Sequence, residues 1–310
     1  MKFHTRTSFL TLTALGVALP LCAVRSDAKT KATPTPSPTP SASPMPSAGI
    51  VVTQAVPVKM PTSFNQGILF PYSYLDAAIG DKINDKGGVD YAVLRGDANL
   101  TIFMQAISSA DLKAFPAFPV KDSKTGETRQ TRNAELVFWI NAYNAHVLKA
   151  VSEAYPVGKI SDIKDFDAAK TRLVAGENYS FQELRRKIFG FDPRALFALA
   201  DGSRGGPLIL PRSYRFRTIN GDLNDAVSRF VSDPRNVEIS RLQSKITISD
   251  YFKIFNDLVG VKNQDTRKMT RLRDLLGTFN TTRGVSSFLN TSPYFIDFRP
   301  ADKALNVQQK

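Results

Sequence analysis

Cysteine and histidine are almost missing from the sequence. Its 310 residues include one cysteine, Cys22, and two histidines, His4 and His146. Because Cys22 and His4 lie near the N-terminus, the chain beyond them has no cysteine for a disulfide, a thiol nucleophile or a thiolate metal site. One histidine is also too few for a multi-histidine metal site. We therefore predict neither a metal nor another cofactor, and any metal would need oxygen ligands.

The first residues have the pattern of a secretory signal. Two basic residues precede an apolar run over residues 9–24, and small residues end the segment at Ala28. The run has about 16 residues, fewer than the ~20 that span a bilayer as a helix. We predict that residues 1–28 are a cleaved signal peptide and that the mature chain has no transmembrane helix. Lipidation at Cys22 is an alternative, which the bulky leucine before it disfavours.

A spacer is predicted behind the signal, over residues 29–70. Residues 29–49 alternate proline with serine and threonine and have too few large apolar side chains to fold. Such a composition forms a semi-extended linker. A single folded domain is predicted over residues 71–310. The predicted export places this domain in the periplasm, outside the cell or at the cell envelope.

The chain is basic, with a formal net charge of +13. Removing the charged residues of the predicted signal peptide, Lys2, Arg6, Arg25 and Asp27, leaves +11. A basic surface attracts polyanions. Because the chain is predicted to be exported, we expect an anionic envelope polymer or lipid headgroup as the partner rather than nucleic acid. The alternative is that the charge serves solubility alone.

Apolar spacing predicts an α+β domain that is rich in helix and has a small sheet. Helices are expected over residues 72–83, 97–108, 133–155, 180–189, 220–231, 249–258 and 266–279. Extended segments are expected at residues 89–94, 171–175, 195–200 and 294–298 and in a hairpin over 237–248. Residues 115–132 are predicted to be an exposed loop. The expected caps are Asp97, Asn133, Ser180, Asn220 and Ser249, and Gly190 is expected to end its helix.

The helix over 133–155 carries amides inside an apolar run. Asn144 lies in the middle of the apolar side, Asn141 lies on one flank, and His146 lies on the other flank with Trp139. A buried amide without partners costs ~1–3 kcal/mol. Asn144 is therefore expected either to tie this helix to an irregular loop or to bind a ligand. His146 is expected to pack on its aromatic neighbours or to act as a base.

The run F-W-I-N-A-Y-N-A over residues 138–145 resembles the signature helix of the domain-of-unknown-function family 547. Further segments similar to the family follow in the same order, including Asp192-Pro193-Arg194, Ser232-Asp233-Pro234-Arg235-Asn236 and a terminal segment that ends at Asn306. The resemblance covers roughly residues 75–306. It implies a shared fold, while the family name itself carries no function.

The chain departs from the family pattern at four positions. The family has a histidine where this chain has Leu196, an asparagine at Ala200, and cysteines at Asp201 and Gly206. The resemblance therefore implies that any thiol chemistry of relatives is missing from this divergent member. Ser203 is retained, so the loop is expected to keep its shape.

The glycine-rich loop over residues 201–207 is expected to be a plain tight turn, but it also offers two chemistries. Ser203 and Asp201 would form a hydrolase site if His146 lay beside them, although the nucleophile-elbow pattern is not met. Alternatively, backbone N–H groups and Arg204 would bind an anion. The loop has no Lys-Ser/Thr ending of a phosphate-binding P-loop. Asp90, Asp201 and Asp302 would form a carboxylate group for acid/base work or a Ca²⁺ site if they converged, although solvated surface positions are expected for them.

These features predict an exported, non-catalytic binding or scaffolding domain at the cell envelope. The alternative is a hydrolase centred on Asp201, Ser203 and His146. No metal site is predicted, and no catalytic residue is assigned. The residues predicted to contribute to a binding site are Asn141, Asn144, His146, Asp201, Ser203, Arg204 and Asp302.

Overall fold

The computed structural model describes residues 70–121, 126, 128–258 and 266–308. The predicted signal peptide, including Cys22, and residues 29–69 of the predicted spacer lie outside these ranges. The first described residue, Phe70, is buried and packs edge-on against Phe103 and Phe138, with ring centroids 5.9 and 5.2 Å away. The hydrophobic core of the described part therefore includes Phe70.

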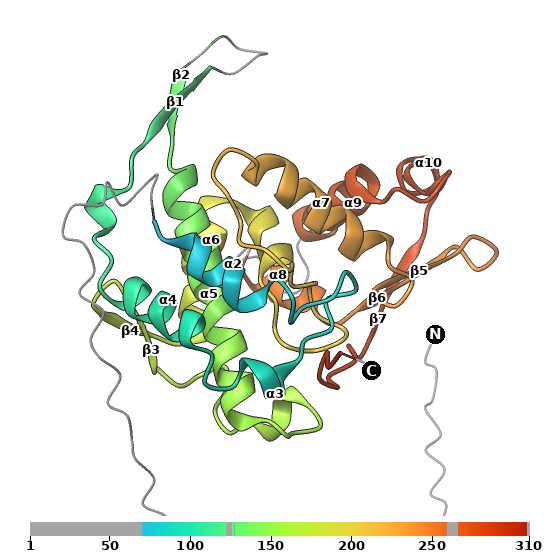
Figure 1. The fold of residues 1–310 in the computed structure, drawn as a ribbon. Helices are drawn as coiled ribbons and strands as arrows, with labels where there is room; N and C mark the ends of the chain where they lie inside the picture. Colours follow the sequence, from blue (N-terminus) through green and yellow to red (C-terminus); the bar gives the residue numbers. More distant parts are fainter. Residues whose placement is uncertain (1–69, 122–125, 127, 259–265, 309–310) are drawn as a thin grey trace, which may run out of the picture. The chain divides into compact units, whose positions relative to one another are not determined.

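The described part is helix-rich and has small sheets, which confirms the predicted α+β class (Figure 1). Its α-helices are α2 (Tyr72–Ile79), α3 (Tyr91–Leu94), α4 (Ala98–Ser108), α5 (Asn133–Ala154), α6 (Phe181–Phe191), α7 (Ile219–Ser232), α8 (Phe252–Leu258), α9 (Thr266–Phe279) and α10 (Val285–Thr291). The 3-10 helices are η1 (Leu112–Ala114), η2 (Ile160–Asp162) and η3 (Pro193–Ala198). The strands are β1 (Phe118–Lys121), β2 (Thr128–Thr131), β3 (Arg172–Val174), β4 (Glu177–Tyr179), β5 (Val237–Ser240), β6 (Lys245–Ser249) and β7 (Phe295–Arg299).

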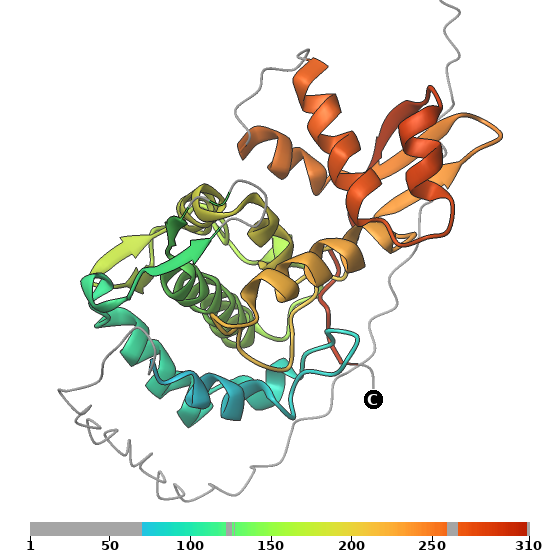
Figure 2. The same ribbon diagram turned by 90° about the horizontal axis from the view of Figure 1, so that it is seen from above.

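Helix α5 is the central element. Helices α3, α4 and α6 pack against it, and Figure 2 shows it nearly end-on with other helices around it. All of its residues from Ala134 to Leu148 are buried. Burial therefore extends to the side opposite Asn144, where Glu135 accepts a hydrogen bond from Trp139 Nε1 at 3.3 Å and pairs with Arg132. A helix enclosed on all sides needs polar groups that are paired internally.

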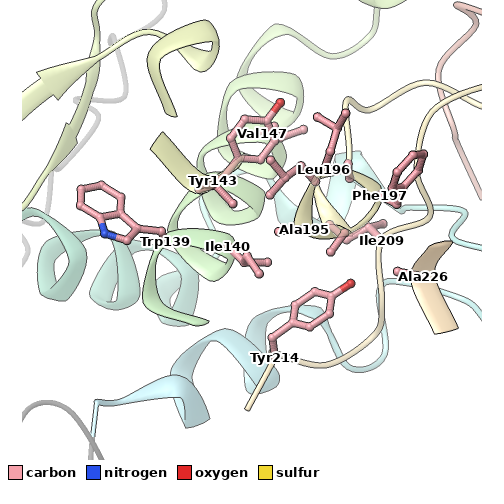
Figure 3. Close-up of a cluster of buried hydrophobic side chains, with 14 of the residues drawn as sticks. Trp139, Ile140, Tyr143, Val147, Ala195, Leu196, Phe197, Ile209, Tyr214 and Ala226 are labelled. Atoms are coloured by element: carbon pink, nitrogen blue, oxygen red, sulfur yellow. The ribbon is translucent and has the colours of Figure 1, made fainter. Parts of the chain in front are cut away.

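The apolar side of α5 packs against η3. Figure 3 shows Ile140 and Val147 of α5 close to Ala195 and Leu196 of η3, with Tyr214 approaching from a third segment. These side chains are at most 2 % exposed. The contact places the residues after η3, which include the glycine-rich loop, at a fixed position next to α5.

Three of the predicted segments have a different structure. Residues 89–94, predicted to be extended, form α3 after the N-cap Asp90, and residues 195–200, predicted to be a strand, lie mostly in η3. Asp192 caps η3 and Pro193 occupies its first turn, a combination that favours helix over strand. Residues 115–132, predicted to be a loop, contain the antiparallel pair β1–β2. Short apolar runs do not distinguish a strand from a buried helical turn.

The strands form three separate sheets rather than the one small sheet predicted. β1 pairs with β2, β3 pairs with β4, and β5, β6 and β7 form a third sheet in that order. The predicted hairpin over 237–248 is confirmed as β5–β6, and the late strand is confirmed as β7, which runs parallel to β6. The segment near Leu173 therefore belongs to a hairpin of its own.

The helix ends predicted from capping residues are only partly correct. The capping box is confirmed, because Ser180 Oγ accepts from Glu183 N at 3.2 Å while Glu183 accepts from Ser180 N at 2.9 Å. The predicted caps Asn133 and Asn220 are wrong, since both residues lie inside their helices. Gly190 does not end α6, which continues to Phe191.

Candidate functional site

The two amides of α5 each hold a neighbouring backbone segment. Asn144 Nδ2 donates to the carbonyl oxygen of Ala198 at 3.0 Å, and its Oδ1 accepts from the nitrogen of Ala200 at 3.0 Å. Asn141 makes the same pair of bonds to Tyr214, at 3.0 and 2.9 Å. Each side chain thus pairs with backbone as a neighbouring strand would. Asn144 is the expected tie to an irregular segment, which lies just before the glycine-rich loop.

His146 faces the β3–β4 hairpin rather than that loop. Its Nε2 lies 3.3 Å from the carbonyl oxygen of Leu173, and its ring is buried. The pKa of His146 is lowered to about 4, mainly by burial and in addition by the nearby Arg172 and Lys149, while the hydrogen bond with Leu173 acts in the opposite direction. A histidine with this pKa is neutral near pH 7 and is a weak general base.

The glycine-rich loop is closed by its own side chains and by the C-terminal segment. Asp201 Oδ1 accepts from Ser203 N at 2.9 Å and from Ser203 Oγ at 2.7 Å. Arg204 N donates to the carbonyl oxygen of Ala304 at 2.9 Å, and Ser203 forms a β-bridge with Leu305. A Cβ on Gly206 would overlap the Asp201 carboxylate. The two positions at which the family pattern has cysteine are therefore in contact.

The aspartates considered for a carboxylate cluster serve local turns instead. Asp90 accepts from Val93 N at 3.3 Å, and Asp302 accepts from Ala304 N at 3.0 Å, just as Asp201 accepts from Ser203 N. In the described ranges no group of three or more histidine, cysteine, aspartate or glutamate side chains is placed to hold a metal. We therefore assign these carboxylates to turn geometry.

A cleft of about 1090 Å³ lies beside the glycine-rich loop. Its walls come from the turn at residues 84–88, from residues 203–208, from α7 with the segment that follows it, and from the C-terminal segment at Asn306. Asn306 joins two of these walls, because it accepts from the Tyr91 hydroxyl at 2.6 Å and donates to the carbonyl oxygen of Gly87 at 2.9 Å. Apolar side chains also line the cleft, including Phe197 and Ala226, which Figure 3 labels.

Both signs of charge line this cleft. The basic side chains are Lys86, Arg204, Arg229 and Arg235, and the acidic ones are Asp85, Asp225 and Asp233. Arg235 pairs with Asp233 at 2.6 Å. Burial opposes ionisation of Asp233, but the hydrogen bonds from Arg235 lower the pKa of its carboxyl overall. Within the described ranges, neither Arg204 nor Arg229 forms an ion pair with a carboxylate. Arg204 Nε donates to the carbonyl oxygen of Leu305 at 3.3 Å, so the two terminal nitrogens of Arg204 and the guanidinium of Arg229 remain for an anion.

Two polar side chains of the cleft are buried. Ser203 is 3 % exposed and Asn236 is 5 % exposed. The side-chain amide of Asn236 makes no hydrogen bond to another described residue, while its backbone nitrogen and carbonyl oxygen bond to Asp233 and Ser249. Because Asn236 lines the cleft, its side-chain amide can bind a polar group or water there.

The structure brings together some of the predicted site residues and separates others. Ser203 and Arg204 line the cleft. Asp201 and Asp302 do not line it but stabilise the loop: Asp201 accepts from Ser203 Oγ, and the carbonyl oxygen of Asp302 accepts from Gly205 N at 2.9 Å. The cleft lining includes none of Asn141, Asn144 and His146.

Sequence reasoning missed four cleft residues: Lys86, Arg229, Arg235 and Asn236. Arg235 and Asn236 lie in the Ser-Asp-Pro-Arg-Asn segment that resembles the family, and this resemblance could have identified them as site candidates. Nothing in the local sequence distinguishes Arg229 from the other polar residues of α7. No helix of the described ranges is both long enough and apolar enough to cross a membrane.

Comparison with protein families gave one match. The family described as "Protein of unknown function, DUF547" matches residues 128–231, a range that contains α5, η3 and the glycine-rich loop. This range is shorter than the resemblance predicted over residues 75–306. Comparison with curated proteins and with solved structures gave no match. The family resemblance predicted from the signature helix is confirmed over residues 128–231, which match the model of DUF547, a family of proteins of unknown function.

Proposed function

We propose that the chain is an exported, non-catalytic binding protein whose cleft holds acidic groups of an anionic envelope polymer. The observation that carries this proposal is the presence of two arginines without a carboxylate partner among the described residues, Arg204 and Arg229, on the walls of one cleft of about 1090 Å³. Guanidinium groups bind phosphate and carboxylate oxygens through paired, charge-assisted hydrogen bonds.

The remaining lining suits a polymer rather than a bare ion. Leu208 and Val307 supply partly exposed apolar surface, and the side-chain amide of Asn236 supplies a donor and an acceptor for hydroxyl groups. The cleft also carries Asp85, Asp225 and Asp233. Fixed charges of both signs favour a ligand whose acidic groups are spaced along a chain, because evenly distributed negative charge would meet these carboxylates.

The export part of the proposal is supported by the sequence of residues 1–28, and the net charge of +11 beyond them favours an acidic partner. The hydrolase alternative gains no support from geometry. The Ser203 hydroxyl donates to Asp201, whereas His146 contacts β3. A serine nucleophile needs a base within hydrogen-bonding distance.

The proposal predicts that the full chain binds oligomers of glycerol phosphate or of galacturonate, which represent phosphate and carboxylate polymers, and not neutral dextran oligomers. The double substitution Arg204→Gln/Arg229→Gln should weaken binding about tenfold or more, because each charge-assisted hydrogen bond contributes about 1.5–3 kcal/mol. Isothermal titration calorimetry at a fixed ionic strength measures the change in Kd.

The matched control is Arg186→Gln/Arg217→Gln, which removes the same charge from exposed positions outside the cleft lining. This control should bind like the unmodified chain. Asn236→Ala should weaken binding with no change of net charge. Equal losses in the two arginine variants would mean that diffuse charge, and not the cleft, attracts the polymer.

A further inference from the structure

A second surface, remote in sequence from the glycine-rich loop, exposes large apolar side chains. Leu242 lies in the four-residue connection between β5 and β6 and is fully exposed. Phe295, the first residue of β7, is 78 % exposed. The two residues lie at the same end of the sheet, because Phe295 N donates to the carbonyl oxygen of Ser244 at 2.9 Å and Phe295 is the register partner of Lys245.

This end of the sheet forms a tip, which we define as residues 241–245, Arg283 and Phe295. Figures 1 and 2 both show the β5–β6 connection reaching beyond the strands. Apart from these two, the described ranges expose only a few large apolar side chains, namely Val93, Leu173 and Phe298. Exposing two large apolar side chains at one tip does not stabilise the fold, so the pair indicates a contact with a partner.

Two basic residues belong to the same tip as the apolar pair. Arg241 and Arg283 are exposed and adjacent, since Arg241 Nη2 donates to the carbonyl oxygen of Arg283 at 3.2 Å. Neither forms an ion pair with a carboxylate of the described ranges. Lys245 pairs with Asp297 at 2.9 Å, so that pair is neutral overall. The tip therefore carries two uncompensated positive charges beside exposed leucine and phenylalanine.

We propose that this tip docks on an anionic lipid bilayer, with Leu242 and Phe295 inserted at the headgroup boundary and Arg241 and Arg283 at the phosphates. Apolar side chains enter the interface while arginines keep their charged ends among the headgroups. Each arginine near an anionic bilayer favours binding by about fivefold, the equivalent of ~1 kcal/mol per charge. This docking involves a different surface from the cleft and holds whether or not the cleft binds a polymer.

Charge complementarity favours a lipid surface over a second copy of the chain. Two tips facing each other would bring Arg241 and Arg283 of each copy together, and the whole chain has a net charge of +13. Like charges at such close approach oppose association. An anionic bilayer instead has negatively charged headgroups for the arginines and, directly below them, an apolar interior for Leu242 and Phe295.

A tryptophan reporter tests the docking in the full chain. The single native tryptophan, Trp139, is completely buried and gives a constant background. On vesicles that contain phosphatidylglycerol, the emission of Leu242→Trp should shift to shorter wavelength and be quenched by brominated lipid tails. Neither change is expected on phosphatidylcholine vesicles. Adding Arg241→Gln should lower partitioning onto the anionic vesicles about fivefold.

The matched control is Val93→Trp, which places the reporter at an exposed apolar position on α3. Its emission should be unchanged even if other segments of the chain bind the vesicles. The proposal is overturned if Leu242→Trp is quenched no more than Val93→Trp, or if neither shows contact with lipid. It is also overturned if light scattering shows that Leu242→Ser and Phe295→Ser abolish an oligomer of the wild-type chain, because the tip would then bind a second copy.

Discussion

The buried polar residues of α5 act mainly on the backbone around them. Asn141 and Asn144 each supply one donor and one acceptor to a segment that belongs to no regular strand. Irregular backbone inside a core has N–H and C=O groups that need partners. The amides therefore fix the positions of residues 198–200 and 214, and the glycine-rich loop begins one residue after Ala200.

Asn144→Ala should destabilise the chain by about 2–4 kcal/mol, because it leaves the Ala198 carbonyl and the Ala200 N–H buried without partners. Urea unfolding followed by circular dichroism measures the loss. Asn178→Ala, at an exposed position of β4, is the control and should change stability by less than about 0.5 kcal/mol. A neutral result for Asn144→Ala, together with loss of polymer binding, would instead assign the amide to the ligand.

His146 makes stability depend on pH. Its folded pKa of about 4 lies below the ordinary value of 6.5, so the unfolded chain takes up a proton first as the pH falls. Stability should be full above pH 6.5, fall between pH 6.5 and 4 by up to about 3 kcal/mol, and then change no further on account of this residue. His146→Gln should lose less stability over this window. Identical pH profiles for the two proteins would show that His146 is accessible to protons when folded.

At the scale of elements, the glycine-rich loop depends on close contacts at two successive glycines. Neither Gly205 nor Gly206 has a positive φ, so an alanine at either position would be opposed by neighbouring atoms rather than by backbone conformation. A Cβ at Gly206 meets the Asp201 side chain, whereas a Cβ at Gly205 would lie 2.5 Å from the backbone nitrogen of Asp302. Only the first of these neighbours can be removed by substitution.

A double-mutant cycle tests this difference. Gly206→Ala should cost about 1–3 kcal/mol, and part of that cost should disappear in the Asp201→Ala background, with a coupling of about 0.5–3 kcal/mol. Gly205→Ala combined with Asp302→Ala is the matched control and should show little coupling. If Gly206→Ala costs the same with and without the Asp201 carboxylate, the two positions are not in contact.

The sequence predicts structure correctly where residues within one short segment decide it. The capping box at Ser180 and Glu183 and the hairpin over 237–248 are of this kind. It failed for residues 195–200, because a run of six apolar residues suits a buried strand and a buried helical turn equally well. The sequence predicts that Asn144 ties its helix to an irregular segment. It does not identify the partners, Ala198 and Ala200, because tertiary packing decides them.

At the scale of the whole molecule, the cleft joins segments that are far apart in the sequence. Residues 84–88, the loop at 203–208, α7 and Asn306 meet around it. The sequence pointed to Ser203 and Arg204, but it gave no reason to place Arg229 beside them. Arg229 lies near the loop because η3 packs on both α5 and α7. This tertiary packing cannot be predicted from a local sequence pattern.

The most direct test of polymer binding in the cleft is a structure of the full chain with a bound glycerol phosphate or galacturonate oligomer. The acidic groups of the oligomer should lie within hydrogen-bonding distance of the guanidinium groups of Arg204 and Arg229, and the Asn236 amide should contact its hydroxyl groups. An oligomer bound outside this cleft, or spread over exposed lysines and arginines elsewhere, would contradict it.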